Sequence, residues 1–151
     1  EPVFSIFSIG KLLESFNNNA EEARKALDYF RDEVKKAGFP GLHIQWNQGG
    51  GSVMSEEAAA RFVNNVKTMG FNSVAMYNMG GTNEDYIVYG SNSIKIREQM
   101  DAILDVPVFP CVSIGWDDTP RFPAKGMNDV VHYHNTPQSF RNPARQIEKI
   151  C

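Results

Sequence analysis

VPVFPCVSIGWDDTPR, residues 106–121, is the stretch that says most about the fold of this chain. It is mainly apolar from Val108 to Ile114 and lies between Pro107 and Gly115, which is the composition of a buried strand. Trp116–Arg121 then brings together an aromatic ring, two carboxylates, a hydroxyl and a guanidinium. Ligands of parallel α/β folds bind where the strands end, so this stretch predicts a strand that leads into a binding site.

The same order of strand and helix recurs upstream of this stretch. Strands are expected over Val3–Ile9, Gly41–Trp46, Asn72–Asn78 and Val108–Ile114. Amphipathic helices are expected over Asn19–Ala37, Ser55–Met69 and Ser93–Leu104, and a last helix begins near Thr136. Asn19 is a suitable N-cap for the first helix and Gly70 a suitable end for the second. The sequence therefore predicts an α/β protein of four consecutive βα units.

Repeated βα units give parallel strands with right-handed crossovers, either in a small open sheet or in half of a (β/α)8 barrel of the TIM type. The second strand places apolar Leu42, Ile44 and Trp46 alternately with polar His43, Gln45 and Asn47. An apolar face suits a helix layer, and a polar face suits a barrel interior that opens into a pocket. An open doubly wound sheet is more often apolar on both faces, so the half-barrel is favoured.

We therefore expect one partial barrel domain over residues 1–151, as a piece of a longer chain. Half a barrel leaves its first and last strands unpaired, and such edges favour self-association. The net charge of −3 argues against a nucleic-acid partner, because phosphate binding needs clustered Lys and Arg. No apolar run approaches the roughly 20 residues of a membrane helix. The closest pair of metal ligands, His132 and His134, is too small a set to predict a metal, and no cofactor is predicted.

Three aromatic residues, Trp46, Tyr77 and Trp116, fall at the carboxyl ends of predicted strands. Flat rings at a barrel mouth can stack on sugar rings, and they can equally be rim residues that cover the core. His43 and Gln45 lie further upstream on the second strand, on the face expected to point inward. A buried histidine is more often a hydrogen-bonded structural residue than a catalyst, so both interpretations stay open for His43.

Asp117 and Asp118 are adjacent, so their side chains point in opposite directions in an extended segment and do not form a catalytic pair. One of them can bind sugar hydroxyls while the other pairs with Arg121; the alternative is a structural turn with a salt bridge. His134, before the last helix, completes the candidate substrate-binding set. The glycine-rich loop at residues 48–52 could hold a phosphate, although a surface loop is favoured.

At Gly115–Arg121 the chain resembles the family-99-like glycoside hydrolases, which include WbsX-type proteins of bacterial polysaccharide loci. That family has a strand ending in Gly-Trp-Asp-Asn-(Thr/Ser)-Pro-Arg, followed by a helix that starts Thr-Pro-x-x-Phe. Here Asp118 replaces the asparagine, and Thr136–Phe140 matches the helix start. Pro2–Phe7 and Gly70–Val74 are also similar, so the resemblance covers nearly the whole chain, with Gly-Trp-Asp as its specific part.

The resemblance implies the central part of a sugar-active barrel that hydrolyses a polysaccharide or oligosaccharide, in a bacterial secreted or periplasmic setting. The family's Asn-Glu-Trp-x-Glu-Gly segment, which carries its catalytic glutamates, is absent from these residues. Pro143 falls inside the last helix, where it is expected to kink that helix or restart it at Asn142. The alternatives are a non-catalytic sugar-binding or interaction module and a small α/β domain that binds a phosphorylated ligand.

Overall fold

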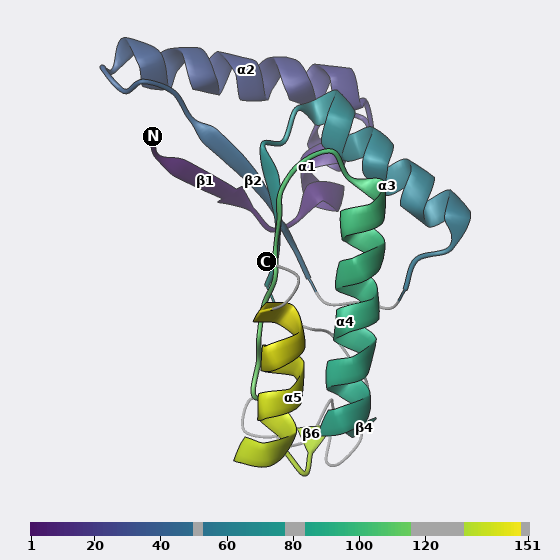
Figure 1. Ribbon diagram of the computed structural model, residues 1–151. Helices are drawn as coiled ribbons and strands as arrows, with labels where there is room; N and C mark the ends of the chain where they lie inside the picture. Colours follow the sequence, from purple (N-terminus) through teal and green to yellow (C-terminus); the bar gives the residue numbers. More distant parts are fainter. Residues whose placement is uncertain (50–52, 78–83, 116–131, 149–151) are drawn as a thin grey trace, which may run out of the picture. The chain divides into compact units, whose positions relative to one another are not determined.

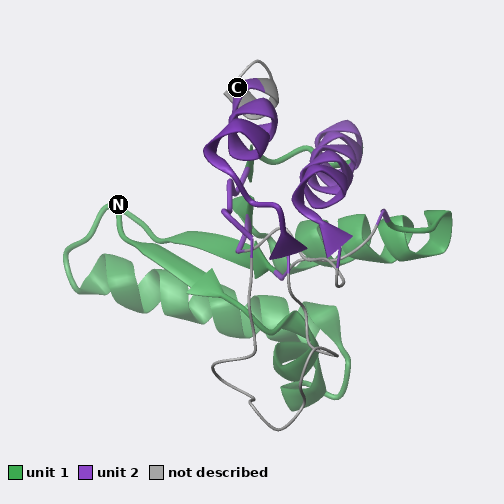
Figure 2. Ribbon diagram, turned by 90° about the horizontal axis from the view of Figure 1, so that it is seen from below, with its two compact units in different colours: residues 1–48, 54–75, 103–109 green, residues 49–53, 76–102, 110–151 purple. Residues whose placement is uncertain are grey.

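The computed structural model describes residues 1–49, 53–77, 84–115 and 132–148 (Figure 1). It is an α/β protein with a four-stranded sheet in the order β1-β2-β3-β5. The chain divides into two compact units, which are coloured separately in Figure 2. Unit 1 comprises residues 1–48, 54–75 and 103–109, and unit 2 comprises residues 49–53, 76–102 and 110–151.

Unit 1 contains the sheet and three helices. Its strands are β1 (Val3–Ile6), β2 (His43–Gln48), β3 (Ser73–Met76, whose last residue is assigned to unit 2) and β5 (Val108–Phe109). Its helices are α1 (Ile9–Ser15), α2 (Ala20–Lys36) and α3 (Glu56–Met69). The strands β1 and β2 pair in parallel, as do β3 and β5. Among the described residues, β1 and β5 are the two edges of this sheet.

Two of the predicted helices have the predicted ends. The Asn19 side chain accepts hydrogen bonds from the N–H groups of Glu21 and Glu22, at 3.0 and 3.2 Å, and so caps α2. Ser55 caps α3, and Gly70 ends it with φ +68°, a left-handed conformation that glycine adopts without strain. The expected N-cap and helix stop are therefore confirmed.

The predicted alternation of β2 is confirmed. Leu42, Ile44 and Trp46 are buried, while the residues between them are half-buried. The Trp46 ring lies 4.6 Å from the ring of Phe62 on α3 and 5.7 Å from that of Phe71, measured between ring centroids. The apolar face of β2 therefore packs against the helix layer, and the opposite face is polar.

Unit 2 contains two long helices and a short pair of parallel strands. They are α4 (Tyr86–Ile103, whose last residue is assigned to unit 1), α5 (Pro137–Glu148), β4 (Glu84–Asp85) and β6 (His132–Tyr133). The buried face of α4 carries Tyr86 and Tyr89, which Phe140 of α5 contacts. None of the helices in the described part of the chain combines the length and apolar character needed to cross a bilayer.

Several predicted boundaries are wrong. The first strand ends at Ile6, and a helix that the sequence did not predict, α1, follows it. The strand expected over Val108–Ile114 keeps its ladder only to Phe109, because Pro110 has no N–H to donate. The expected restart at Asn142 is also wrong, since one helix spans Pro137–Glu148.

Candidate functional site

Four polar side chains form a row across the polar face of the sheet in unit 1. The Ser5 hydroxyl of β1 donates to Gln45 Oε1 of β2 at 3.0 Å, and Gln45 Nε2 donates to Ser73 Oγ of β3 at 3.2 Å. His43 Nε2 lies 2.7 Å from the same Ser73 oxygen. We call Ser5, His43, Gln45 and Ser73 the polar ladder. The structure thus brings together two residues that the sequence predicted as site residues, His43 and Gln45.

The pairing of the strands fixes the register of this ladder. Val3 is opposite His43 and Ser5 is opposite Gln45 in the parallel pair β1–β2. Asn72 joins β2 to β3, because its N–H donates to the Ile44 carbonyl at 2.8 Å and its side-chain oxygen accepts from the Ile44 N–H at 2.9 Å. The ladder is therefore built by backbone geometry rather than by side-chain contacts alone.

The ladder offers neutral hydrogen-bonding groups. Ser73 Oγ accepts from Gln45, so its own proton can be donated to His43 Nε2, which leaves His43 Nδ1 as a donor. At the end of β2, Asn47 Oδ1 is buried and has no hydrogen-bond partner among the described residues. Because buried polar atoms are nearly always paired, we expect this oxygen to accept a hydrogen bond from a donor outside the described residues.

The predicted aromatic residues have different surroundings. Trp46 is 8% exposed and packs in the core against Phe62 and Phe71, so it is a core residue and offers no open face to a ligand. Tyr77 is exposed. The predictions for Trp116, Asp117, Asp118 and Arg121 fall outside the described residues, as do residues 50–52 of the glycine-rich loop.

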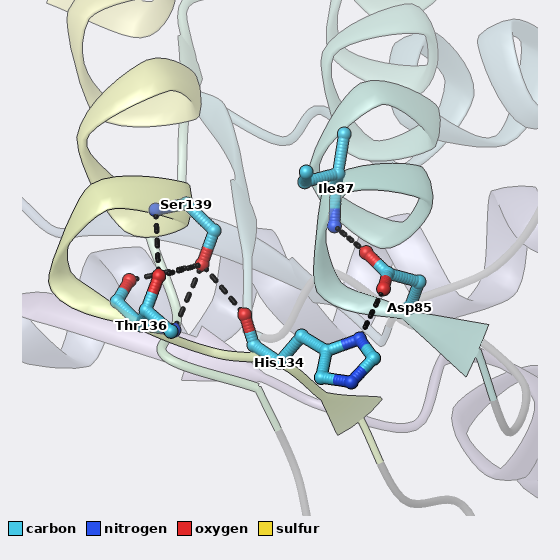
Figure 3. Close-up of polar contacts among 5 residues, drawn as sticks. All are labelled: Asp85, Ile87, His134, Thr136 and Ser139. Carbon is cyan, nitrogen blue, oxygen red and sulfur yellow. Dashed lines mark hydrogen bonds and ion pairs between the residues drawn. The ribbon is translucent and has the colours of Figure 1, made fainter.

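His134, the remaining predicted residue, lies in unit 2 and forms a pair with Asp85 (Figure 3). Its Nδ1 is 2.7 Å from Asp85 Oδ2, and the other carboxylate oxygen accepts from the Ile87 N–H at 2.9 Å. The bond to His134 and, to a lesser degree, the bond from the Ile87 N–H hold the pKa of Asp85 below its usual value. Asp85 was not predicted from the sequence, although its position just before a helix suits a capping carboxylate.

The other histidine of the pair considered for metal binding is engaged separately. The His132 ring stacks on Tyr89 with a centroid distance of 3.8 Å, and burial lowers the pKa of His132. Burial also raises the pKa of Tyr86 to about 12, and its hydroxyl donates to the Ser113 carbonyl. No group of three or more potential metal-ligating side chains occurs within the described ranges.

The bond between Asp85 and His134 predicts a pH dependence. Because the folded state holds the pKa of Asp85 below the usual 3.8, the pair stabilises unit 2 above that pH, and this contribution is lost as the pH falls through the lowered pKa. We expect the protection of the His132 and Tyr133 amides on β6, taken relative to their intrinsic exchange rates, to fall in that acidic range. Asp85→Asn should remove this pH dependence, and an unchanged profile in that variant would contradict the assignment.

The chain was compared with models of known protein families, with curated proteins and with solved structures, and none of the three comparisons finds a match. The assignment of function therefore depends on two observations. One is the geometry of the polar ladder in unit 1, and the other is the resemblance carried by Gly115–Arg121.

Proposed function

We propose that this chain is about half of a (β/α)8 barrel from a glycoside hydrolase of the family-99-like type. Its polar ladder faces the glycan, and the main catalytic glutamates lie outside these residues. The observation that carries the proposal is the polar ladder, which lies on the face of the sheet opposite the buried face of Ile44 and Trp46. A (β/α) barrel has this division, with an outer face under helices and an inner face that leads to the site.

The chemistry of the polar ladder suits a sugar. Each sugar hydroxyl both donates and accepts a hydrogen bond, and the ladder offers a hydroxyl, an amide and an imidazole in one row. A phosphorylated ligand would call for cationic groups, and the ladder has no Lys or Arg. These groups support a neutral glycan as the ligand, with Trp116, Asp117, Asp118 and Arg121 as proposed further contacts.

Glycoside hydrolysis needs a general acid and a second carboxylate, usually supplied by different strands. The polar ladder contains no carboxylate. We therefore propose that these 151 residues bind the glycan without hydrolysing it. The edge strands β1 and β5 are the proposed places where a second copy, or the rest of a longer chain, completes the sheet.

The proposal is tested by titrating the purified chain with a panel of bacterial and plant polysaccharides and following amide shifts by NMR. We expect weak binding with shifts at β2 and β3 and no release of reducing sugar. Gln45→Leu removes two hydrogen bonds of the ladder at nearly constant volume and should weaken binding about three- to tenfold, the effect of one such bond or more.

Ser91→Ala is the matched control, because Ser91 is exposed on α4 and its hydroxyl donates to the Ile87 carbonyl of the same helix, its one hydrogen bond within the described residues. This variant should bind as the unmodified chain does. Absence of binding to every glycan of the panel would overturn the proposal. Equal affinities for Gln45→Leu and Ser91→Ala would show that the polar ladder does not bind the glycan. Hydrolysis of a glycan by the chain would show that the catalytic acids lie within these residues.

A further inference from the structure

The pair Asp85–His134 in unit 2 gives an exposed imidazole a defined orientation. The His134 side chain is 74% exposed, yet its Nδ1 is fixed on Asp85, whose second oxygen is in turn fixed by the Ile87 N–H. The backbone of His134 has φ +58°, a left-handed conformation that costs energy for a residue with a side chain. Its carbonyl accepts from the Ser139 hydroxyl at 2.8 Å, which anchors that conformation (Figure 3).

The hydrogen bond to Asp85 determines which nitrogen of the imidazole is a donor. An ionised carboxylate only accepts hydrogen bonds, and the pKa of Asp85 is lowered, so Nδ1 must carry the proton. In the neutral imidazole Nε2 is then an acceptor. The ring therefore presents a fixed hydrogen-bond acceptor on its side away from Asp85.

An aromatic ring accompanies this acceptor. Tyr133, the neighbouring residue on β6, is exposed, and its ring meets the His134 ring edge to face at a centroid distance of 5.2 Å. An exposed aromatic face beside an oriented hydrogen-bonding group is the combination that sugars require, because their C–H faces stack on rings and their hydroxyls bond to polar groups. The remaining titratable residues of the two short strands are Glu84 and His132.

We propose that Asp85, Tyr133 and His134 form a sugar subsite, in which His134 Nε2 accepts a hydrogen bond from a glycan hydroxyl and Tyr133 stacks on the sugar ring. This inference rests on the proposed function, since it names a further contact for the same class of ligand. It adds two residues that the sequence did not indicate, Asp85 and Tyr133. Asp85 acts as a positioning residue, because it touches His134 and not the sugar.

The inference is tested by long-range 1H–15N NMR of the imidazoles, with the methyl glycosides of mannose, glucose, galactose and N-acetylglucosamine and with the bound polysaccharide as probes. We expect His134 to be protonated at Nδ1 when neutral, and its Nε2 resonance to move on addition of sugar.

Three variants separate the roles. His134→Asn removes the imidazole but keeps a residue type that tolerates positive φ, and should weaken binding about three- to tenfold. Tyr133→Ala removes the ring that stacks on the sugar and should also bind more weakly. Asp85→Asn should shift the imidazole toward the Nε2–H form and lower affinity without unfolding the chain.

Binding that perturbs the polar ladder but leaves His134 unshifted would overturn this inference and leave the proposed function standing. Failure of every glycan to perturb either cluster would overturn both. A neutral His134 imidazole that carries its proton mainly on Nε2 would also refute the inference.

Discussion

Gly90→Val is expected to destabilise the packing of α4 on α5 by about 2–3 kcal/mol, the upper range for overpacked sites. A Cβ atom at Gly90 would lie 2.5 Å from Cγ of Pro143, and a proline ring cannot rotate away as a flexible side chain can. The two helices would have to separate, and the contact of Phe140 with Tyr86 and Tyr89 would loosen. Amide exchange in α4 and α5 should accelerate about 30- to 150-fold, the equivalent of that free energy.

Gly10→Val is the matched control, because no atom lies within 4 Å of a Cβ built at Gly10 in α1. It should be nearly neutral, since valine and glycine differ little in helix propensity. Combining Gly90→Val with Pro143→Ala removes the opposing ring and should recover much of the loss. A double variant no more stable than Gly90→Val alone would show that the ring of Pro143 is not the cause.

Pro143 also shows where a local rule fails, because the restart of the helix that it predicted does not occur. Proline removes a helix hydrogen bond, so the sequence predicted a kink or restart there. The structure has a continuous helix with a buried Pro143, whose ring approaches Gly90 where no side chain stands in the way. Tertiary contact thus compensates for an unfavourable residue, and such a contact depends on a partner that lies far away in the sequence.

Helix starts were likewise predicted correctly where the signal is local and missed where the helix depends on tertiary packing. Asn19 and Ser55 marked the starts of α2 and α3 correctly because a cap acts within one turn. The start of α4 at Tyr86 was missed, since Tyr86–Gly90 consists of aromatic, β-branched and glycine residues that favour a helix weakly. These residues are helical because Tyr86 and Tyr89 are buried in unit 2.

The part of the candidate site that depends on the alternation of side chains along a strand could be predicted from the sequence. Alternation along β2 indicated that His43 and Gln45 share a face, and the structure adds their partners Ser5 and Ser73 from neighbouring strands. The pairing of His134 with Asp85 spans 49 residues of sequence, and no local pattern indicates it. Register between strands and contacts between distant segments are set by the folded chain as a whole.

Trp46→Ala is expected to cost about 3–5 kcal/mol, the range for removing a large buried aromatic side chain. The ring is 8% exposed and packs against Phe62 and Phe71, so its removal leaves a cavity between the sheet and α3. Amide exchange in α2 and α3 measures the loss. Tyr29→Ala is the matched control, because the Tyr29 ring on α2 is 67% exposed, and a change within about 0.5 kcal/mol is expected there.

The same position decides between the two interpretations of Trp46. A stacking platform for sugar would lose affinity in any variant without an aromatic ring, whereas a core residue needs only its volume to be filled. Trp46→Met fills much of the cavity with a flexible apolar side chain and should leave glycan affinity unchanged within about twofold while costing less stability than alanine. A tenfold loss of affinity in Trp46→Met, with exchange in α2 and α3 unchanged, would make Trp46 a sugar contact and contradict its placement in the core.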